Sequence, residues 1–225
     1  MLCAERMGCH GMSEERRPPN GPHVVGEVEA FDPGPSVSLA AAALQGISAP
    51  FALIGGLALD AWGIPRATKD VDLAVPVGSA EPAAERLRSA TTEVRPLRIG
   101  GVGLRERDRG LRIDLVDRRV HFSGLFQEAI AEAASSGRRA RVAGIEVPLV
   151  SLEHLLVMKM VSGEPKDEVD ARRILQLETL DYARARGIAE RHLGAASANR
   201  LDALAREVGR PEVARRLYRN GDDHE

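Results

Sequence analysis

The sequence predicts an α+β (α/β) fold in which a sheet-containing part is followed by a part made only of helices. Short apolar segments that end at glycine or proline alternate with helical patterns through the first two thirds of the chain. After Val150 the strand patterns stop. From there the apolar spacing is that of successive helices, which we expect over residues 151–162, 167–178, 181–192, 197–208 and 211–219.

The chain has 225 residues, enough for one sizeable domain or two small ones. We expect a disordered tail over residues 1–35, because Pro, Gly, Glu and Arg dominate there without apolar periodicity. The expected core spans residues 36–150, and a helical C-terminal region spans residues 151–225.

The core should alternate helices and strands. Alanine-rich residues predict a helix over 38–45, and a short apolar strand over 51–54 ends at a glycine pair. A helix over 57–62 should stop before Pro65, since proline cannot continue it. The other expected elements are a strand over 71–75, a helix over 80–90, strands over 103–107 and 111–116, a helix over 125–134 and an edge strand over 140–147.

Composition limits the function classes. Aromatic residues make up only 3% of the chain, which argues against a base-stacking surface for single-stranded nucleic acid. The formal net charge of −2 excludes a global basic footprint, so a site for a polyanion would have to be a local patch.

Both cysteines, Cys3 and Cys9, lie in the first ten residues and cannot form a disulfide framework for the chain. Cys9-His10 has no second ligand pair at zinc spacing. The chain has no apolar run of roughly 18 residues and no signal-peptide core. We therefore expect a cytoplasmic protein that does not bind membranes.

Asp70 and Asp72 are the first candidate for chemistry. Residues i and i+2 of a strand share a face, so both carboxylates point together while Val71 and Leu73 pack into the core. Two carboxylates this close repel each other unless a cation lies between them. Mg²⁺ binds such pairs together with substrate phosphates. The alternative is an ordinary solvated strand end.

Gly55 and Gly56 follow an apolar strand and open a helix. Free backbone N–H groups and the absence of side chains would let a phosphate approach there. The alternative is a plain strand–helix turn. The segment is not a P-loop, because the Lys-Ser/Thr of that motif is missing, and Gly101-Val-Gly103 lacks the third glycine of a dinucleotide fingerprint.

Two further charged residues interrupt apolar patterns. Asp114 lies between Ile113 and Leu115, and either a rim position or a shared metal site would explain it. Asp117 lies three residues after Asp114 and therefore on the opposite face of the strand, so it is less suited to a shared metal site. Lys159 lies in the middle of the apolar face of the helix over 151–162, so it must either extend its ammonium group to solvent or meet an anion.

The order of these motifs resembles that of the nucleotidyltransferase superfamily with a DNA polymerase β-like fold. Gly55-Gly56 is followed by thirteen residues and then Asp70-x-Asp72, with Arg66-x-Thr68 just before the pair. In particular, the chain resembles the AbiEii-type toxin nucleotidyltransferases, through the run 148–159 and the motif Pro165-Lys166-Asp167-x-x-Asp170. The resemblance spans roughly residues 50–178.

The resemblance implies a nucleotidyltransferase-like mixed sheet with flanking helices. It implies a metal-dependent transfer of a nucleoside monophosphate from an NTP to an acceptor hydroxyl, with release of pyrophosphate. Asp70, Asp72 and Asp114 would be catalytic and bind Mg²⁺ (or Mn²⁺). The residues that would contact the nucleotide are Gly55, Gly56, Arg66, Thr68, Lys159, Lys166, Asp167 and Asp170.

Some of these roles have alternatives. Many similar sequences have a serine after the first glycine, so Gly56 leaves only backbone donors. Asp167 could instead cap a helix with Asp170 as its partner three residues on, and Lys166 could be a solvated loop charge.

The acceptor stays open. A toxin-like enzyme would modify RNA such as tRNA, or another macromolecule, and could have a cognate antitoxin. An antibiotic-modifying enzyme would adenylylate an aminoglycoside. A third hypothesis is a non-catalytic scaffold whose C-terminal helices bind a partner, although three retained carboxylates argue against it.

Overall fold

Two parallel strands with the same pattern of exposure form the centre of the fold. The computed structural model describes residues 32–108 and 111–210. In β2 (Asp70–Ala74) and β5 (Arg112–Val116), partly exposed and buried residues alternate over the first four positions. Val71, Leu73 and their counterparts on β5 lie in the core, so the charged residues of both strands share the opposite face.

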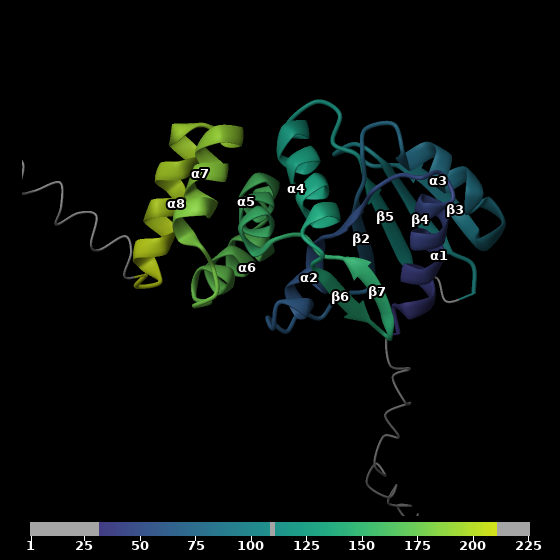
Figure 1. Cartoon of the computed structure of the whole chain (residues 1–225), viewed down its shortest axis with the longest axis horizontal. Coiled ribbons are helices and arrows are strands. Elements are labelled where there is room, and N and C mark those ends of the chain that lie inside the picture. The colour runs from purple at the N-terminus through teal and green to yellow at the C-terminus, as the bar shows by residue number, and fades with distance from the viewer. Residues whose placement is uncertain (1–31, 109–110, 211–225) are drawn as a thin grey trace, which may run out of the picture. The chain divides into compact units, whose positions relative to one another are not determined.

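These two strands belong to a five-stranded mixed sheet with the order β1-β2-β5-β4-β3 (Figure 1). β2 and β5 are parallel, whereas β1 pairs with β2, β4 with β5 and β3 with β4 in antiparallel fashion. The outer strands are β1 (Ala52–Leu53), β4 (Val102–Glu106) and β3 (Thr91–Pro96). The expected mixed sheet with flanking helices is confirmed.

Four α-helices and a short 3-10 turn accompany this sheet. α1 contacts β5 and α3, α3 contacts β4, α2 packs on β2, and α4 contacts β1. Their bounds are α1 Gly34–Gln45, α2 Gly55–Ala61, α3 Ala80–Arg86, the 3-10 turn Arg88–Ala90 and α4 Ser123–Ser135.

The edge strand predicted over 140–147 is wrong, because the chain turns in its middle. β6 (Arg139–Val142) and β7 (Ile145–Pro148) form a separate two-stranded antiparallel sheet. Ala143 and Gly144 both have positive φ, 47° and 86°, as a two-residue hairpin turn requires. The alanine concealed this turn, since Asn or Gly is usual there.

Strand β3 was not expected from the sequence. Most of its side chains are exposed, and it lies at the edge of the sheet, so it lacks the alternation of apolar and polar residues that marks a half-buried strand. The helix predicted over 80–90 is shorter than expected, because regular α-helix ends at Arg86.

Beyond β7 the described chain contains helices only, as predicted: α5 Leu152–Ser162, α6 Pro165–Leu175, α7 Tyr182–Leu193 and α8 Ala195–Glu207. None of the helices described is long and apolar enough to cross a membrane. The predicted tail, both cysteines and the helix expected over 211–219 lie outside the described residues, apart from the last residues of the tail segment.

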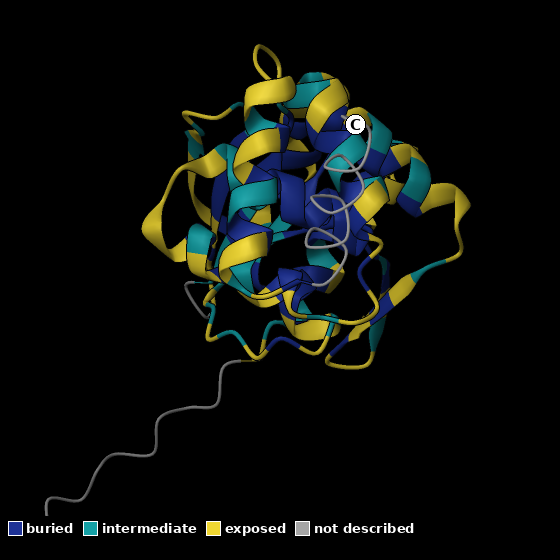
Figure 2. Cartoon of the chain, turned by 90° about the vertical axis from the view of Figure 1, so that its left-hand side faces the viewer, coloured by how far each residue is buried: buried dark blue, intermediate teal, exposed yellow. Residues whose placement is uncertain are grey.

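Helix α5 is the central helix of this part and is buried around most of its circumference. Residues 152–158 are all buried, and the helix contacts α4, α6 and α7 (Figures 1 and 2). Its first turn is capped by Ser151, whose hydroxyl accepts a hydrogen bond from the backbone N–H of His154.

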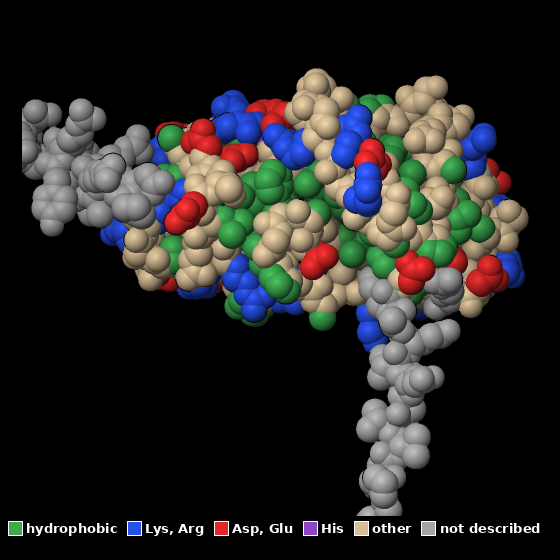
Figure 3. Space-filling model, turned by 60° about the horizontal axis from the view of Figure 1, so that its bottom comes forward, with side chains coloured by type: hydrophobic (Ala, Val, Ile, Leu, Met, Phe, Trp, Pro, Cys, Tyr) green, Lys and Arg blue, Asp and Glu red, His purple; other side chains and the backbone are tan. Residues whose placement is uncertain are grey.

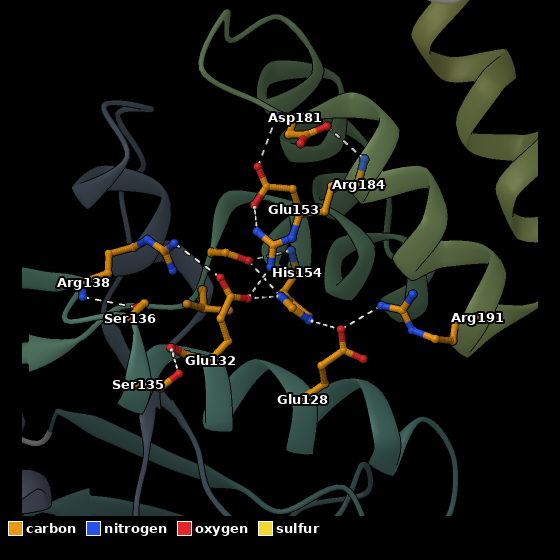
Figure 4. Close-up of polar contacts among 12 residues, drawn as sticks. Glu128, Glu132, Ser135, Ser136, Arg138, Glu153, His154, Asp181, Arg184 and Arg191 are labelled. Atoms are coloured by element: carbon orange, nitrogen blue, oxygen red, sulfur yellow. Dashed lines mark hydrogen bonds and ion pairs between the residues drawn. The ribbon is translucent and has the colours of Figure 1, made fainter.

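A buried polar network fixes α5 against α4 and α7 (Figure 4). Nδ1 of the fully buried His154 lies 2.8 Å from Oγ of Ser151 and 2.9 Å from Oε2 of Glu132 on α4. From α7, the guanidinium of Arg184 donates to Glu132 and to Glu153 of α5. Because each charge has a partner of opposite sign, the three helices are held in one arrangement.

Candidate functional site

A cleft of about 550 Å³ brings most of the predicted site residues together. The strand pair β2–β5, the start of α2, the loop before β2, helices α4 and α5, and the start of α6 all contribute to its wall. The predicted residues that line it are Gly55, Gly56, Arg66, Thr68, Asp70, Asp72, Asp114, Lys159, Lys166 and Asp167. Asp170 lies behind this wall and is almost fully buried.

The carboxylates meet because β2 and β5 run in register. Asp72 is paired directly with Asp114 in the parallel ladder, and Asp70 lies on the same face one pleat away. Asp70 is the most accessible of the three, with 42% of its side chain exposed, compared with 17% for Asp114. All three carboxylates thus open into one cleft.

Burial, together with the neighbouring carboxylates, raises the pKa of two of these groups. Burial, followed by the charges of Asp114 and Asp70, raises the pKa of Asp72 to about 7. Burial also raises the pKa of Asp114, while the guanidinium groups of Arg112 and Arg95 lower it in part. Protein cations therefore do not fully compensate the negative charge at this face.

Arg112 is the nearest protein cation to the carboxylates, but its contacts are long. Its Nη1 lies 4.0 Å from Oδ2 of Asp70, and its Nε lies 3.8 Å from Oδ1 of Asp114. Oδ1 of Asp114 is buried and has no hydrogen-bond partner among the described residues. An unpaired buried carboxylate oxygen of this kind fits a site for a hard cation.

In the described part of the chain, no three Asp, Glu, His or Cys side chains are placed so that they could hold a metal ion by themselves. This does not conflict with a magnesium site, because Mg²⁺ is commonly held by one or two carboxylates and completes its shell with substrate phosphates and water. The oxygen donors of Asp70, Asp72 and Asp114 fit that mode of binding.

Position 55 has no room for a side chain, because its backbone lies so close to the carboxylate of Asp72. It has φ of +68°, and a Cβ at this position would lie 2.0 Å from Oδ2 of Asp72. The backbone N–H of Ile54 donates to the carbonyl oxygen of Asp72 at 3.0 Å, which fixes this close approach. The glycine pair and the aspartate pair are thus directly adjacent in space.

Gly56 is packed against Thr68 instead. A Cβ at position 56 would lie 2.8 Å from Cβ and 3.0 Å from Oγ1 of Thr68. The hydroxyl of Thr68 therefore lies directly beside Gly56.

Lys159 meets anions of its own chain. Its Nζ lies 2.5 Å from Oδ1 of Asp167 and 3.0 Å from Oδ2 of Asp170, and only 12% of its side chain is exposed. The hydroxyl of Ser162 also donates to Asp167, and Nε of Arg66 lies 3.4 Å from Asp170. Two cations and two carboxylates form a compact cluster at the cleft wall.

Asp167 does not cap helix α6, because the helix begins at Pro165 and Glu164 occupies the N-cap position. The alternative of a capping pair is therefore wrong. Lys166 is 62% exposed and pairs with Glu164 at 2.9 Å, which places it at the rim of the cleft.

A family model described as a nucleotidyl transferase AbiEii toxin of a type IV toxin–antitoxin system matches residues 38–220 of this chain. The chain belongs to the AbiEii nucleotidyltransferase family. It is therefore a nucleotidyltransferase, and the predicted resemblance is confirmed. No curated protein sequence shows a significant match to it.

Solved structures with a related fold share little sequence with this AbiEii-family member. The crystal structure of ANT(2")-Ia in complex with adenylyl-2"-tobramycin is 21% identical over 77% of this chain and 96% of that chain, with a TM-score of 0.44. An antigenic nucleotidyltransferase-like protein from Paracoccidioides brasiliensis is 18% identical over 72% and 90%, with a TM-score of 0.41. Lincomycin-bound LnuA is 10% identical over 65% and 98%, with a TM-score of 0.43.

The cleft residues that sequence reasoning missed include Arg112, Arg118 and Phe126. Arg112 could have been predicted as a site residue from the sequence, because it lies two residues before Asp114 and therefore on the same face of the strand. Arg118 lies beyond the end of β5 and Phe126 in α4, so only the tertiary structure brings them to the cleft.

Arginines on and after β4 are mostly engaged within the AbiEii-family fold and so are poor candidates for gripping an RNA arm. Arg105 pairs with Glu93, Arg107 donates to backbone carbonyls of Ser89 and Thr91, and Arg109 lies outside the described residues. On the face in Figure 3, basic and acidic side chains are interspersed, so no single-sign patch appears there.

Proposed function

We propose that this AbiEii-family enzyme uses the cleft around Asp70, Asp72 and Asp114 to transfer a nucleoside monophosphate from an NTP to an acceptor hydroxyl. The observation that carries the proposal is the register of β2 and β5, which sets Asp72 opposite Asp114 beneath Gly55. The acceptor oxygen would form a bond to the α-phosphorus, the bond to pyrophosphate would break, and pyrophosphate would leave with the bonding electrons.

The three carboxylates would hold Mg²⁺ or Mn²⁺ together with the phosphates of the NTP. When bound, the metal would neutralise charge on the phosphate oxygens and orient them. The carboxylate of Asp114, whose Oδ1 has no hydrogen-bond partner in the described chain, would also take up the proton that the acceptor hydroxyl loses as its oxygen attacks. That contact would orient the attacking oxygen.

Backbone and basic groups of the same cleft would hold the leaving phosphates. Gly55 and Gly56 offer backbone N–H groups without side chains that would obstruct a phosphate. Lys159 is held in place by Asp167 and Asp170, and Lys166 lies at the rim. Positive groups fixed before the reaction stabilise charge on a leaving group without reorganisation.

A second cavity supports a polyanionic acceptor. It has a volume of about 810 Å³ and shares Arg66, Thr68 and Asp70 with the cleft. The basic residues along its wall are Arg66, Lys69, Arg141 and Lys166, whereas Asp60 and Asp70 are the acidic ones. Arg66, Arg141 and Lys166 also pair with Asp170, Glu146 and Glu164, so the argument for RNA, for example tRNA, over a polycationic aminoglycoside rests on basic groups exposed along this wall and on Lys69. Such an activity would suit a cytoplasmic toxin that is controlled by an antitoxin.

The test is transfer of label from each α-labelled NTP, with Mg²⁺, to total tRNA or to an aminoglycoside such as tobramycin. We expect labelled tRNA with the wild-type enzyme and with the Glu178→Gln control, which removes an exposed carboxylate that does not line the cleft. Asp72→Ala should abolish the labelling. Full activity of this variant would refute the site, and labelled tobramycin would establish the small-molecule alternative.

A further inference from the structure

One part of the cleft differs in chemistry from the carboxylate site. Ile99, Val116 and Phe126 line it together with the guanidinium-bearing side chain of Arg118. We call these four residues the Arg118 pocket. None of them carries a carboxylate, although they belong to the same cleft as Asp72 and Asp114.

Arg118 lies close to two aromatic rings and forms no ion pair among the described residues. Its Cζ is 5.6 Å from the ring centroid of Phe126 and 5.9 Å from that of Phe122. Its Nε is buried without a hydrogen-bond partner, and no ion pair to Arg118 occurs within residues 32–108 and 111–210. Its guanidinium is thus an unpaired, planar group with a flat face in a cleft.

The surrounding backbone holds Arg118 in this position. Phe122 precedes α4 in the left-handed conformation, with φ of 64°, which is costly for an aromatic residue. On the other side, a Cβ at Gly100 would lie 3.4 Å from the Cα of Arg118, so the loop that carries Ile99 packs directly on this segment. A strained backbone retained next to a cleft indicates a functional constraint.

The pocket lies at the right spacing from the reacting groups. Asp114 and Val116 share one face of β5, and two residues of a strand span about 7 Å. A nucleotide whose α-phosphate lies beside the carboxylate site would therefore extend its ribose and base past Val116 toward Arg118. Apolar walls beside a flat cation suit a nucleobase, which can stack on both.

We propose that the Arg118 pocket binds the nucleobase of the NTP and that Arg118 is a positioning residue for the nucleotide. This proposal rests on the proposed function, because it takes the triphosphate to lie at the carboxylates. It assigns to Arg118 a contact with the base and not with the phosphates.

The test compares the binding of each NTP with that of inorganic tripolyphosphate, which has the phosphates but no base, by calorimetry with Mg²⁺. Wild-type enzyme should bind at least one NTP about tenfold more tightly than tripolyphosphate. Arg118→Met should weaken the binding of that NTP about five- to tenfold and leave the binding of tripolyphosphate unchanged. Ile99→Ser, at an exposed position, should act in the same direction and keeps the test valid if Arg118→Met fails to fold.

The matched control is Arg98→Met, which removes the same charge from an exposed position next to Ile99 but outside the cleft wall. It should alter neither affinity. Equal weakening of NTP and tripolyphosphate by Arg118→Met would make Arg118 a phosphate ligand and overturn the proposal, as would no effect on either. If wild-type enzyme binds neither ligand with Mg²⁺, the proposed function itself fails.

Discussion

Asp72 and Asp114 lie directly opposite each other on the two central parallel strands of the sheet. Each follows a buried residue and precedes another, so neither carboxylate can turn away without exposing the core. The fold therefore maintains two like charges at one point. A protein retains such an arrangement at a cost in stability when the site needs it.

Asp72→Asn should separate stability from activity. Because folding raises the pKa of Asp72 from 3.8 to about 7, its contribution to stability is full below pH 3.8 and is lost as the pH rises through 7. At pH 8 the metal-free variant should be more stable than wild type, by on the order of a few kcal/mol. Nucleotidyl transfer should fall at least about a hundredfold. Denaturant unfolding at pH 5 and pH 8, without metal, measures the difference in stability between the variant and wild type. A variant that is less stable than wild type at pH 8 would contradict the prediction.

Gly55→Ala should displace Asp72, because the new Cβ would lie 2.0 Å from its Oδ2. We expect a loss of more than about tenfold in Mg²⁺-dependent NTP affinity. Gly63→Ala is the matched control: Gly63 has φ of +81°, but nothing lies within 4 Å of the added Cβ. Both variants should lose about 1–2 kcal/mol from backbone strain. Equal NTP affinities in the two variants would show that the contact with Asp72 is unimportant.

Lys159→Met should leave Asp167 and Asp170 buried with too little positive charge. Breaking a buried ion pair in this way costs about 3–5 kcal/mol of unfolding free energy. The double variant Lys159→Met/Asp167→Asn should recover much of that stability but no transfer activity, since the proposed phosphate contact is still missing. Thermal unfolding and transfer assays measure both. A double variant that regains full activity would make Lys159 purely structural.

His154 should make the free energy of unfolding depend on pH. Burial lowers its pKa, while the carboxylates of Glu132 and Glu128 oppose that shift. The native state thus keeps His154 neutral, and the unfolded chain takes up the proton as the pH falls below about 6.5. Stability should therefore decrease below that pH. His154→Gln should reduce this pH dependence, whereas the exposed His121→Gln should not; urea unfolding at pH 5, 6 and 7 is the measurement.

Regular alternation made the centre of the fold predictable. In β2 and β5 charged and apolar residues alternate, so the sequence pattern indicated both the strands and the shared face of Asp70 and Asp72. The hairpin β6–β7 was missed because Ala143 occupies a turn position that usually selects Gly or Asn. β3 was missed because an exposed edge strand has little apolar pattern to detect.

The residues of the site could be predicted only where they lie together on a single strand or helix. Local spacing was enough to group Asp70 with Asp72 and to single out Lys159 as an anion-seeking residue on an apolar helix face. The 2.0 Å approach of a Gly55 Cβ to Asp72 and the position of Arg118 over Phe126 depend on contacts between elements distant in sequence. No periodicity within a single element reports such contacts.

The most direct test of the account is calorimetric titration of each NTP into the wild-type enzyme with and without Mg²⁺, because it requires no knowledge of the acceptor. We expect at least one of the four NTPs to bind, with one molecule per chain and only when Mg²⁺ is present. This binding should be lost in Asp72→Ala and retained in Glu178→Gln. Absence of Mg²⁺-dependent binding for all four NTPs, or its retention in Asp72→Ala, would contradict the account.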